Sequence, residues 1–226
     1  ISVRDWSSDV CSSDLVLGPL RAWQDDVELD LGPPARRAVL GLLVLAGGAR
    51  VPRSELVDAL WGDRPPASAA NVLQTHVKHL RRLLEPGRPA RTPSAVIVYV
   101  NGGYTLPADA VDADLGSFRR NVDLADVADR DGDVERVAAV LQEALTWWRG
   151  HPLTDIASRA THPKVVSLLA EHRLALIRYG EAMIATGAAA EALPTLSIAA
   201  AERPLDERVQ AVLINVNRAA GYRAAA

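Results

Sequence analysis

The sequence of 226 residues predicts a mainly α-helical protein with a small β component, organised as two successive parts. Residues 15–109 combine short strand-like runs with short apolar helices and close with a hairpin pattern. From residue 110 onward, helical segments follow one another and are separated only by short stretches that contain Gly or Pro. The composition, 49% hydrophobic and 23% charged with a net charge of −3, supports a globular protein with a substantial core.

The first part opens with strand-like runs. LVLGPLRAW and VELDLG are separated by the polar residues 24–26, a pattern that predicts two strands joined by a hairpin turn. The second run ends at Gly32, and Pro34 suits the first turn of a helix because its missing N–H is not needed there. The helix in ARRAVLGLLVLAGG is almost entirely apolar after Arg37 and is expected to end at Gly47. VPRSELVDALWG predicts a second, shorter helix packed on the first.

The third helix, in SAANVLQTHVKHLRRLLEPG, has the clearest periodicity in the chain. Ser68 is predicted to be its N-cap, and Pro86 with Gly87 is expected to end it. One apolar stripe is expected to be buried: Leu73, Val77, Leu80 and Leu84. The opposite face carries amide, hydroxyl and basic side chains, so the helix is predicted to pack with one side and present the other to solvent.

A hairpin pattern follows the third helix. VIVYV and YTL are strand-like, and the Asn-Gly-Gly sequence at 101–103 between them is typical of a tight turn. Strands, then three short helices, then a two-stranded ribbon are the outline of a winged helix-turn-helix. Residues 15–109 are therefore predicted to form a winged-helix domain.

The second part is predicted to be all-α. Its periodic segments cover 113–130, 133–149, 162–186, 188–201 and 205–219. Paired helices of this length, with small residues where they would cross, are typical of helical repeats. Residues 110–226 are therefore expected to form a tetratricopeptide-like domain. The final AGYRAAA ends where another helix would start, and we expect the C-terminus to be truncated there.

Catalytic and cofactor motifs are missing from the sequence. It contains no GxxxxGK[ST] or GxGxxG phosphate loop, no HExxH and no CxxC. His76 and His79 lie three positions apart on the third helix without a third ligand nearby, so an ordinary role on the polar face is favoured over metal binding. No Ser, His and Asp spacing indicates a triad. We expect a protein that is not an enzyme, with no catalytic residue, no cofactor and no metal.

Positive charge is concentrated in residues 71–91, although the whole chain is slightly acidic. This stretch carries five basic side chains against the single acid Glu85, a local charge of +4. The basic residues are Lys78, Arg81, Arg82, Arg88 and Arg91. Such a cluster indicates a face that binds a polyanion. Charge alone leaves the alternative open, which is a solvated helix face without a partner.

The third helix also has the side chains that reading DNA requires. An α-helix fits the major groove of B-DNA, where Asn and Gln can pair with adenine, and Lys and Arg can reach guanine or phosphate. The predicted base-reading residues are Asn71, Gln74, Thr75 and Lys78. The predicted phosphate-binding residues are Arg81 and Arg82 on the helix, and Arg88 and Arg91 in the loop after it. For each residue alone, an exposed side chain without a partner stays the alternative.

Several stretches closely resemble the Streptomyces antibiotic regulatory protein (SARP) family. They are LVLGPL, the long run PPARRAVLGLLVLAGGARVPRSELVDALWGDRPPASAANVLQTHVKHLRRLLEPG, and NGGYTL. LQEALTWWRGHPLTDI and the helices after it resemble the bacterial transcriptional activator domain of the same family. The resemblance covers residues 15–223, and DIASRATHPKVVSLLAEHR is the stretch least typical of it.

The resemblance implies an OmpR-type winged helix with an N-terminal antiparallel sheet, a recognition helix at 69–85 and a wing at 96–106. It also implies a transcriptional activator that binds direct repeats in promoters and recruits RNA polymerase holoenzyme, for secondary-metabolite genes. We expect a homodimer on DNA, because two half-sites need two reading helices. The alternative from another class is a helical-repeat interaction module whose winged helix binds protein, which the basic cluster disfavours.

Residues 1–14 have no counterpart in the family and resemble translated sequencing-adapter sequence. We hypothesise that they are not native, and we assign no role to Cys11, the single cysteine. One cysteine cannot form an internal disulfide, which is typical of the reducing cytoplasm. No apolar run reaches the roughly 18 residues of a membrane span, and the N-terminus has no secretory pattern. The expected location is the cytoplasm, in association with the nucleoid and not with a membrane.

Overall fold

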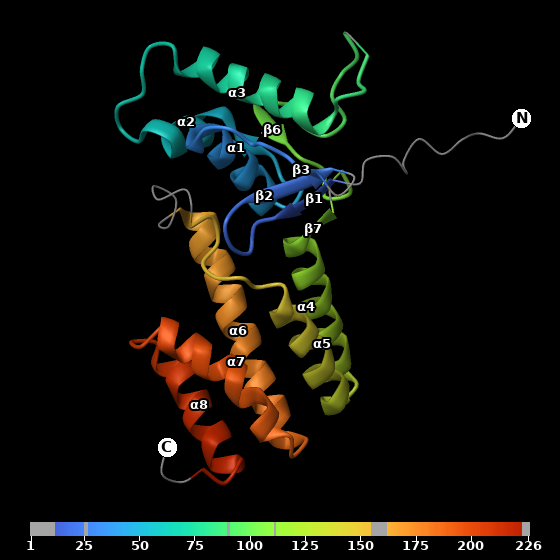
Figure 1. Ribbon diagram of the computed structural model, residues 1–226, viewed down its shortest axis with the longest axis vertical. Helices are drawn as coiled ribbons and strands as arrows, with labels where there is room; N and C mark the ends of the chain where they lie inside the picture. Colours follow the sequence, from blue (N-terminus) through green and yellow to red (C-terminus); the bar gives the residue numbers. More distant parts are fainter. Residues whose placement is uncertain (1–11, 25–26, 90, 111, 155–161, 223–226) are drawn as a thin grey trace, which may run out of the picture. The chain divides into compact units, whose positions relative to one another are not determined.

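The computed structural model describes residues 12–24, 27–89, 91–110, 112–154 and 162–222. The chain divides into two compact units (Figure 1). The first contains Ile1–Gly116 and Arg149–Ser167, and the second contains Ser117–Trp148 and Leu168–Ala226. The predicted fold class is confirmed, because small sheets and a helix-turn-helix make up the first unit and helices make up the second. Cys11 lies outside the described residues.

The first sheet has the strand order β3-β2-β1-β7. Its strands are β1 (Ser12–Leu15), β2 (Arg21–Gln24), β3 (Val27–Glu28) and β7 (Asp112–Ala113). β1 pairs antiparallel with β2 and parallel with β7. β2 pairs antiparallel with β3, with Trp23 opposite Glu28 and Gln24 opposite Val27, so the predicted hairpin is confirmed.

The run LVLGPLRAW is not one strand, contrary to the prediction. β1 ends at Leu15, and β2 starts only after Pro19. Between them, the backbone N–H groups of Val16 and Leu17 donate to the carboxylate of Asp114 at 2.9 and 3.0 Å. These N–H groups are therefore not available to a strand ladder, and Pro19 has no N–H to donate.

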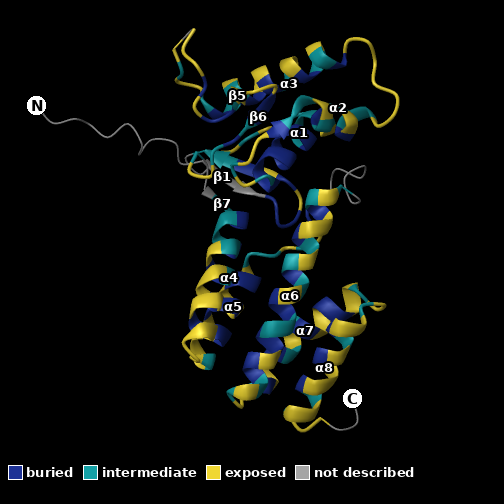
Figure 2. Ribbon diagram, turned by 180° about the vertical axis from the view of Figure 1, so that it is seen from behind, coloured by how far each residue is buried: buried dark blue, intermediate teal, exposed yellow. Residues whose placement is uncertain are grey.

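Helices α1 (Pro34–Leu45), α2 (Arg53–Trp61) and α3 (Ala69–Leu84) lie close to their predicted bounds. α1 is buried from Ala38 to Leu45 and packs against both α2 and α3, so it forms the centre of the helix-turn-helix. The predicted apolar stripe of α3 is buried: Leu73, Val77, Leu80 and Leu84. Figure 2 shows buried residues along one side of this helix and exposed residues along the other.

Ser68 is the N-cap residue of α3, as predicted, although its side chain accepts no capping hydrogen bond. An N-cap residue whose side chain accepts a hydrogen bond from the first turn usually has an extended backbone. Ser68 has φ −87° and ψ 4°, which does not direct its hydroxyl at the free N–H groups of the first turn. Its carbonyl oxygen accepts from Asn71 N at 2.9 Å and from Val72 N at 3.0 Å.

The predicted hairpin is formed by β5 (Val98–Val100) and β6 (Gly103–Thr105), and it joins β4 (Val51–Pro52) in a sheet of order β4-β6-β5. Val51 pairs with Tyr104, and Pro52 pairs with Gly103. A Cβ atom at Gly103 would lie 2.4 Å from the Val51 carbonyl oxygen, so only glycine permits this close approach. The wing is therefore attached to the chain just before α2.

The second unit is built from the helices that the Gly and Pro punctuation predicts. They are α4 (Asp114–Arg130), α5 (Val134–Thr146), α6 (Pro163–Ala185), α7 (Ala189–Glu202) and α8 (Glu207–Ala219), and the first residues of α4 and α6 belong to the first unit. Asp133 caps α5 and Asp206 caps α8 through their side-chain oxygens. α7 packs against α8. Among the helices in the described part of the chain, none has both the length and the apolar character that crossing a bilayer requires.

Candidate nucleic-acid interface

The exposed face of α3 contains the predicted base-reading side chains. Asn71, Gln74, Thr75 and Lys78 are exposed, and the apolar stripe is buried on the opposite side. Their spacing of three or four positions places them along one line of the helix surface. The Thr75 hydroxyl donates to the Asn71 carbonyl oxygen at 2.9 Å, and its oxygen keeps its capacity to accept. The buried stripe therefore holds the helix while this line of polar groups faces solvent.

Three of the predicted cations are exposed. They are Lys78 and Arg82 on α3 and Arg91 in the loop after it. None of them forms an ion pair with a residue that the structure describes. Their positive charge is therefore not neutralised locally and is available to a polyanion.

The remaining two predicted cations are engaged within the protein. Arg81 is half-buried, and its Nε donates to the Ile97 carbonyl oxygen at 2.8 Å. Burial lowers the pKa of Arg81, although a guanidinium stays protonated in proteins. The Arg88 Nε lies 3.5 Å from the Glu85 Oε2, and the Arg88 Nη1 donates to the Thr92 carbonyl oxygen. Neither guanidinium is as free to meet a phosphate as that of Arg82.

Glu85, the one acid of the basic stretch, is used in the fold. Its carboxylate accepts hydrogen bonds from the Ser94 hydroxyl, from Ala95 N at 2.8 Å and from Val96 N at 3.4 Å. These groups belong to the segment that leads into β5. The carboxylate is therefore occupied by this segment and by Arg88, and it leaves the exposed cations of α3 unpaired.

Arg50 and Arg53 lie beside the wing turn and are not among the predicted site residues. The Arg50 Nη1 donates to the Asn101 carbonyl oxygen at 3.3 Å, and Arg53 N donates to the Gly102 carbonyl oxygen at 3.2 Å. The pairing of β4 with β6 brings both arginines to the turn. β4 has only two residues, so no periodic pattern could have predicted it.

His76 and His79 differ in environment. His76 is half-buried, and burial lowers its pKa, with smaller contributions from Arg36 and His79. His79 is exposed. No group of three or more His, Cys, Asp or Glu residues that could hold a metal ion occurs among the residues whose placement is described.

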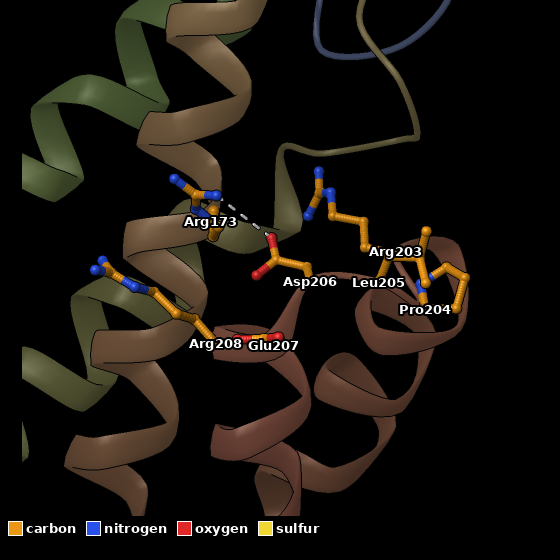
Figure 3. A pocket seen from close by; sticks show the side chains of 7 residues that line it. All are labelled: Arg173, Arg203, Pro204, Leu205, Asp206, Glu207 and Arg208. Carbon is orange, nitrogen blue, oxygen red and sulfur yellow. Dashed lines mark ion pairs between the residues drawn. The ribbon is translucent and has the colours of Figure 1, made fainter.

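A hollow of about 600 Å³ lies in the second unit (Figure 3). Its lining residues are Arg173, Arg203, Pro204, Leu205, Asp206, Glu207 and Arg208. Asp206 already pairs with Arg173, with 3.6 Å between the carboxylate and the guanidinium. In Figure 3 the guanidinium groups of Arg203 and Arg208 point in different directions, so these cations do not converge on one ligand. We therefore place the candidate site on α3.

Comparisons with known proteins bear on both units. Residues 27–106 match the family described as "Transcriptional regulatory protein, C terminal", and residues 113–226 match "Bacterial transcriptional activator domain". "Regulatory protein AfsR" of Streptomyces coelicolor is 35% identical over 88% of this chain, which spans only 19% of that protein. "Regulatory protein DnrI" of Streptomyces peucetius is 34% identical over 87% of this chain and 74% of its own length. The solved structure "Mycobacterium tuberculosis EmbR in complex with low affinity phosphopeptide" is similar with a TM-score of 0.79 and 29% identity, over 95% of this chain and 56% of that one.

Proposed function

The chain belongs to the SARP family of transcriptional regulators, in which an OmpR-type DNA-binding region is joined to a bacterial transcriptional activator domain, and on this premise we propose that it binds promoter DNA through α3 and activates transcription. The observation that carries the proposal is the exposed face of α3, where amide, hydroxyl and cationic groups lie opposite a buried stripe. The chain spans 19% of AfsR and 74% of DnrI. We therefore propose, and do not take from these relatives as shown, that the whole protein activates transcription.

The chemistry of the face supports reading of the major groove. The amides of Asn71 and Gln74 each offer a donor and an acceptor, which matches the edge of adenine. Thr75 and Lys78 are the remaining base-reading candidates. They lie on the same exposed line, one turn further along α3 from Asn71 and Gln74. Contacts from these side chains would give the sequence preference of the protein.

Three arginines, Arg82, Arg88 and Arg91, are proposed to bind the sugar-phosphate backbone. Arg82 and Arg91 have the strongest support, because both are exposed and neither has a carboxylate partner among the described residues. Arg88 stays a predicted phosphate contact. Its guanidinium already contacts Glu85 and Thr92, so it can extend less far toward a phosphate. Phosphate contacts fix the register of a protein on the duplex without reading its sequence.

The further steps of activation are proposals that rest on the family. We propose direct repeats in promoters as targets, RNA polymerase holoenzyme as partner, secondary-metabolite genes as the regulated class, and a cytoplasmic, nucleoid-associated location. We also propose a homodimer on DNA, because two half-sites need two reading helices. Size-exclusion chromatography with and without a selected duplex tests the homodimer, and a single-chain mass on a two-repeat duplex would contradict it.

The direct test is the affinity of the full chain for duplex DNA across a salt series, on sites that the protein selects from random sequence. Lys78→Ala is expected to weaken binding by about 1–3 kcal/mol, roughly 5- to 150-fold in Kd, and to relax the preference at one base position. Arg82→Ala is expected to weaken all sequences alike, and to reduce the slope of log K against log salt by about 1.

Arg136→Ala is the matched control, because Arg136 is an exposed arginine on α5 in the second unit. Its affinity for DNA is expected to equal that of the wild type. Unchanged affinity in both Lys78→Ala and Arg82→Ala would contradict the role of α3. Failure of the wild type to bind any duplex in a salt-sensitive way would instead favour a winged helix that binds protein.

A further inference from the structure

The last turn of α3 is tied to the segment that leads into the wing. Arg81 lies in the last turn of α3, and Glu85 is the C-cap residue that follows Leu84. The Arg81 Nε donates to the Ile97 carbonyl oxygen at 2.8 Å. Glu85 accepts from Ala95 N at 2.8 Å and from the Ser94 hydroxyl. The end of α3 therefore holds residues 94–97 from two sides: Arg81 donates to a carbonyl oxygen of that segment, and the C-cap residue Glu85 accepts from its N–H and hydroxyl groups.

Ser94 connects these hydrogen bonds into a chain. Its hydroxyl donates to the Glu85 carboxylate and accepts from Ile97 N at 3.1 Å. Ile97 is thus fixed at its N–H through Ser94 and at its carbonyl oxygen through Arg81. Hydrogen bonds to charged groups are roughly twice as strong as those between neutral groups, so this arrangement resists displacement.

Packing adds to the hydrogen bonds. Ser94, Val96 and Ile97 are buried, and β5 begins at Val98 immediately after them. The loop that separates α3 from this segment contains Pro and Gly and would not by itself set the position of the hairpin. The last turn of α3 and its C-cap residue therefore fix the start of β5, while β6 is held separately by its pairing with β4.

We propose that Arg81 and Glu85 are positioning residues that hold the wing hairpin in register with α3, so that helix and wing contact neighbouring stretches of one duplex together. This inference rests on the proposed function and deepens it. It replaces the phosphate contact predicted for Arg81, because the Nε of that guanidinium is bound to Ile97 and the side chain is half-buried.

The test combines two footprints of the full chain on its selected duplex. Protection of guanine N7 from methylation reports the major groove under α3, and protection from hydroxyl radicals reports the backbone under the wing. Glu85→Gln keeps the size of the side chain and removes its charge. Ser94→Ala removes the hydroxyl, and Ser94→Thr keeps it and serves as the matched control.

The positioning role predicts a selective loss. Glu85→Gln, Ser94→Ala and Arg81→Ala are expected to keep guanine protection at saturating protein and to lose backbone protection under the wing, with Kd raised about tenfold. Ser94→Thr is expected to keep both footprints. In free protein, amide hydrogen exchange should rise across 98–105 in Ser94→Ala and stay unchanged in α3.

The outcomes distinguish the positioning role from a phosphate contact by Arg81 and from the proposed function itself. Equal loss of both footprints, or retention of both, in Glu85→Gln and Ser94→Ala would overturn the positioning role. Loss of a single phosphate protection beside α3 in Arg81→Ala, with an intact wing footprint, would identify Arg81 as a phosphate contact. A wild type that protects no DNA would contradict the proposed function itself. The exchange measurement would then still report separately whether the last turn of α3 fixes the wing.

Discussion

His172 on α6 is a buried histidine that the protein keeps neutral. Its ring stacks on Trp148 with 3.7 Å between centroids and 10° between planes, and Phe118 meets the same indole edge-on. An Arg203 amino group lies 3.1 Å from the His172 Nδ1. Because arginine only donates, this nitrogen must accept, and the imidazole carries its proton on Nε2. Burial, and then the charge of Arg203, lower the pKa of His172 to about 3.

This environment predicts an acid-sensitive second unit. Well above pH 6.5 the imidazole is neutral in both folded and unfolded chains, so its contribution to stability is fully present there. As the pH falls from 6.5 toward 3, the unfolded chain binds a proton that the folded chain does not bind. The free energy of unfolding should therefore fall by about 1.4 kcal/mol per pH unit in that range. Denaturant unfolding from pH 4 to pH 8 measures this slope.

His172→Phe is expected to lower the stability at neutral pH, because Arg203 loses an acceptor, and to flatten the acid slope. His79→Gln removes an exposed histidine and serves as the control, with the wild-type slope retained. A slope that persists unchanged in His172→Phe would show that other groups cause the acid sensitivity.

Asp114 illustrates which single residues could not be predicted. Its side chain is 0% exposed and accepts from Val16 N and Leu17 N, and the Arg149 Nη2 lies 2.6 Å from it. In the sequence it is one acidic residue at a helix start, and its partners lie far away in the chain. The exposed and buried faces of α3 could be predicted, because the spacing of Leu73 and its neighbours is a local signal.

At the scale of elements, α6 is packed closely against both α7 and α8 at Gly180. A Cβ atom at this position would lie 2.6 Å from the Val212 Cγ2 and 3.1 Å from the Leu196 Cδ1. Gly180 thus permits a close approach of helices, as the small residues of this region predicted. The absence of a side chain, and not a special backbone angle, is what the position requires.

Gly180→Ala is therefore expected to destabilise the second unit by about 1–3 kcal/mol, although alanine is the better helix former. Val212→Ala alone should also destabilise, because it leaves a cavity. The double variant should lose less than the sum of the two, since the missing methyl groups make room for the new one. Denaturant unfolding of the four proteins measures the coupling, and strict additivity would contradict the contact.

Helix bounds could be predicted because Gly, Pro and capping residues punctuate them, whereas the strands depended on distant partners. The strand predicted across Gly18 and Pro19 was wrong, since its N–H groups bind Asp114. β4 was missed because it has two residues, and Arg50 and Arg53 were missed with it. In the candidate site, Arg81 donates to Ile97 and Arg88 contacts Glu85 and Thr92, whereas the other predicted cations stay exposed. No local pattern predicts these partners, because they depend on where the chain runs after α3.

At the scale of the whole molecule, the unit that carries α3 is built from stretches far apart in the chain. Arg149 N donates to the Leu17 carbonyl oxygen, and Leu153 N donates to the Gly18 carbonyl oxygen, both at 2.8 Å. A predicted boundary between 109 and 110 would separate these partners. That residues 15–109 fold independently stays a prediction. The packing of residues 149–154 on the first unit makes it testable, because a variant can weaken that packing.

Leu153 is the residue to substitute in this test. It is 2% exposed, and a Cβ atom at Gly41 of α1 would lie 2.8 Å from its Cδ2, so its side chain packs directly on the α1 backbone. Leu153→Ala is expected to destabilise the first unit by about 2–5 kcal/mol. Leu205→Ala, at a leucine that is 94% exposed in the second unit, is the matched control and should cost little.

Hydrogen exchange locates the effect as well as measuring it. If residues 149–154 are an integral part of the DNA-binding unit, Leu153→Ala should raise the exchange of amides in α1 and α3 and leave α7 and α8 unchanged. DNA affinity should then fall only by the fraction of chains whose first unit is open, because Leu153 lies outside the proposed interface. Unaltered protection in α1 and α3 would mean that the packing of Leu153 is not needed to hold α1 and α3, and that residues 149–154 are not an integral part of the DNA-binding unit.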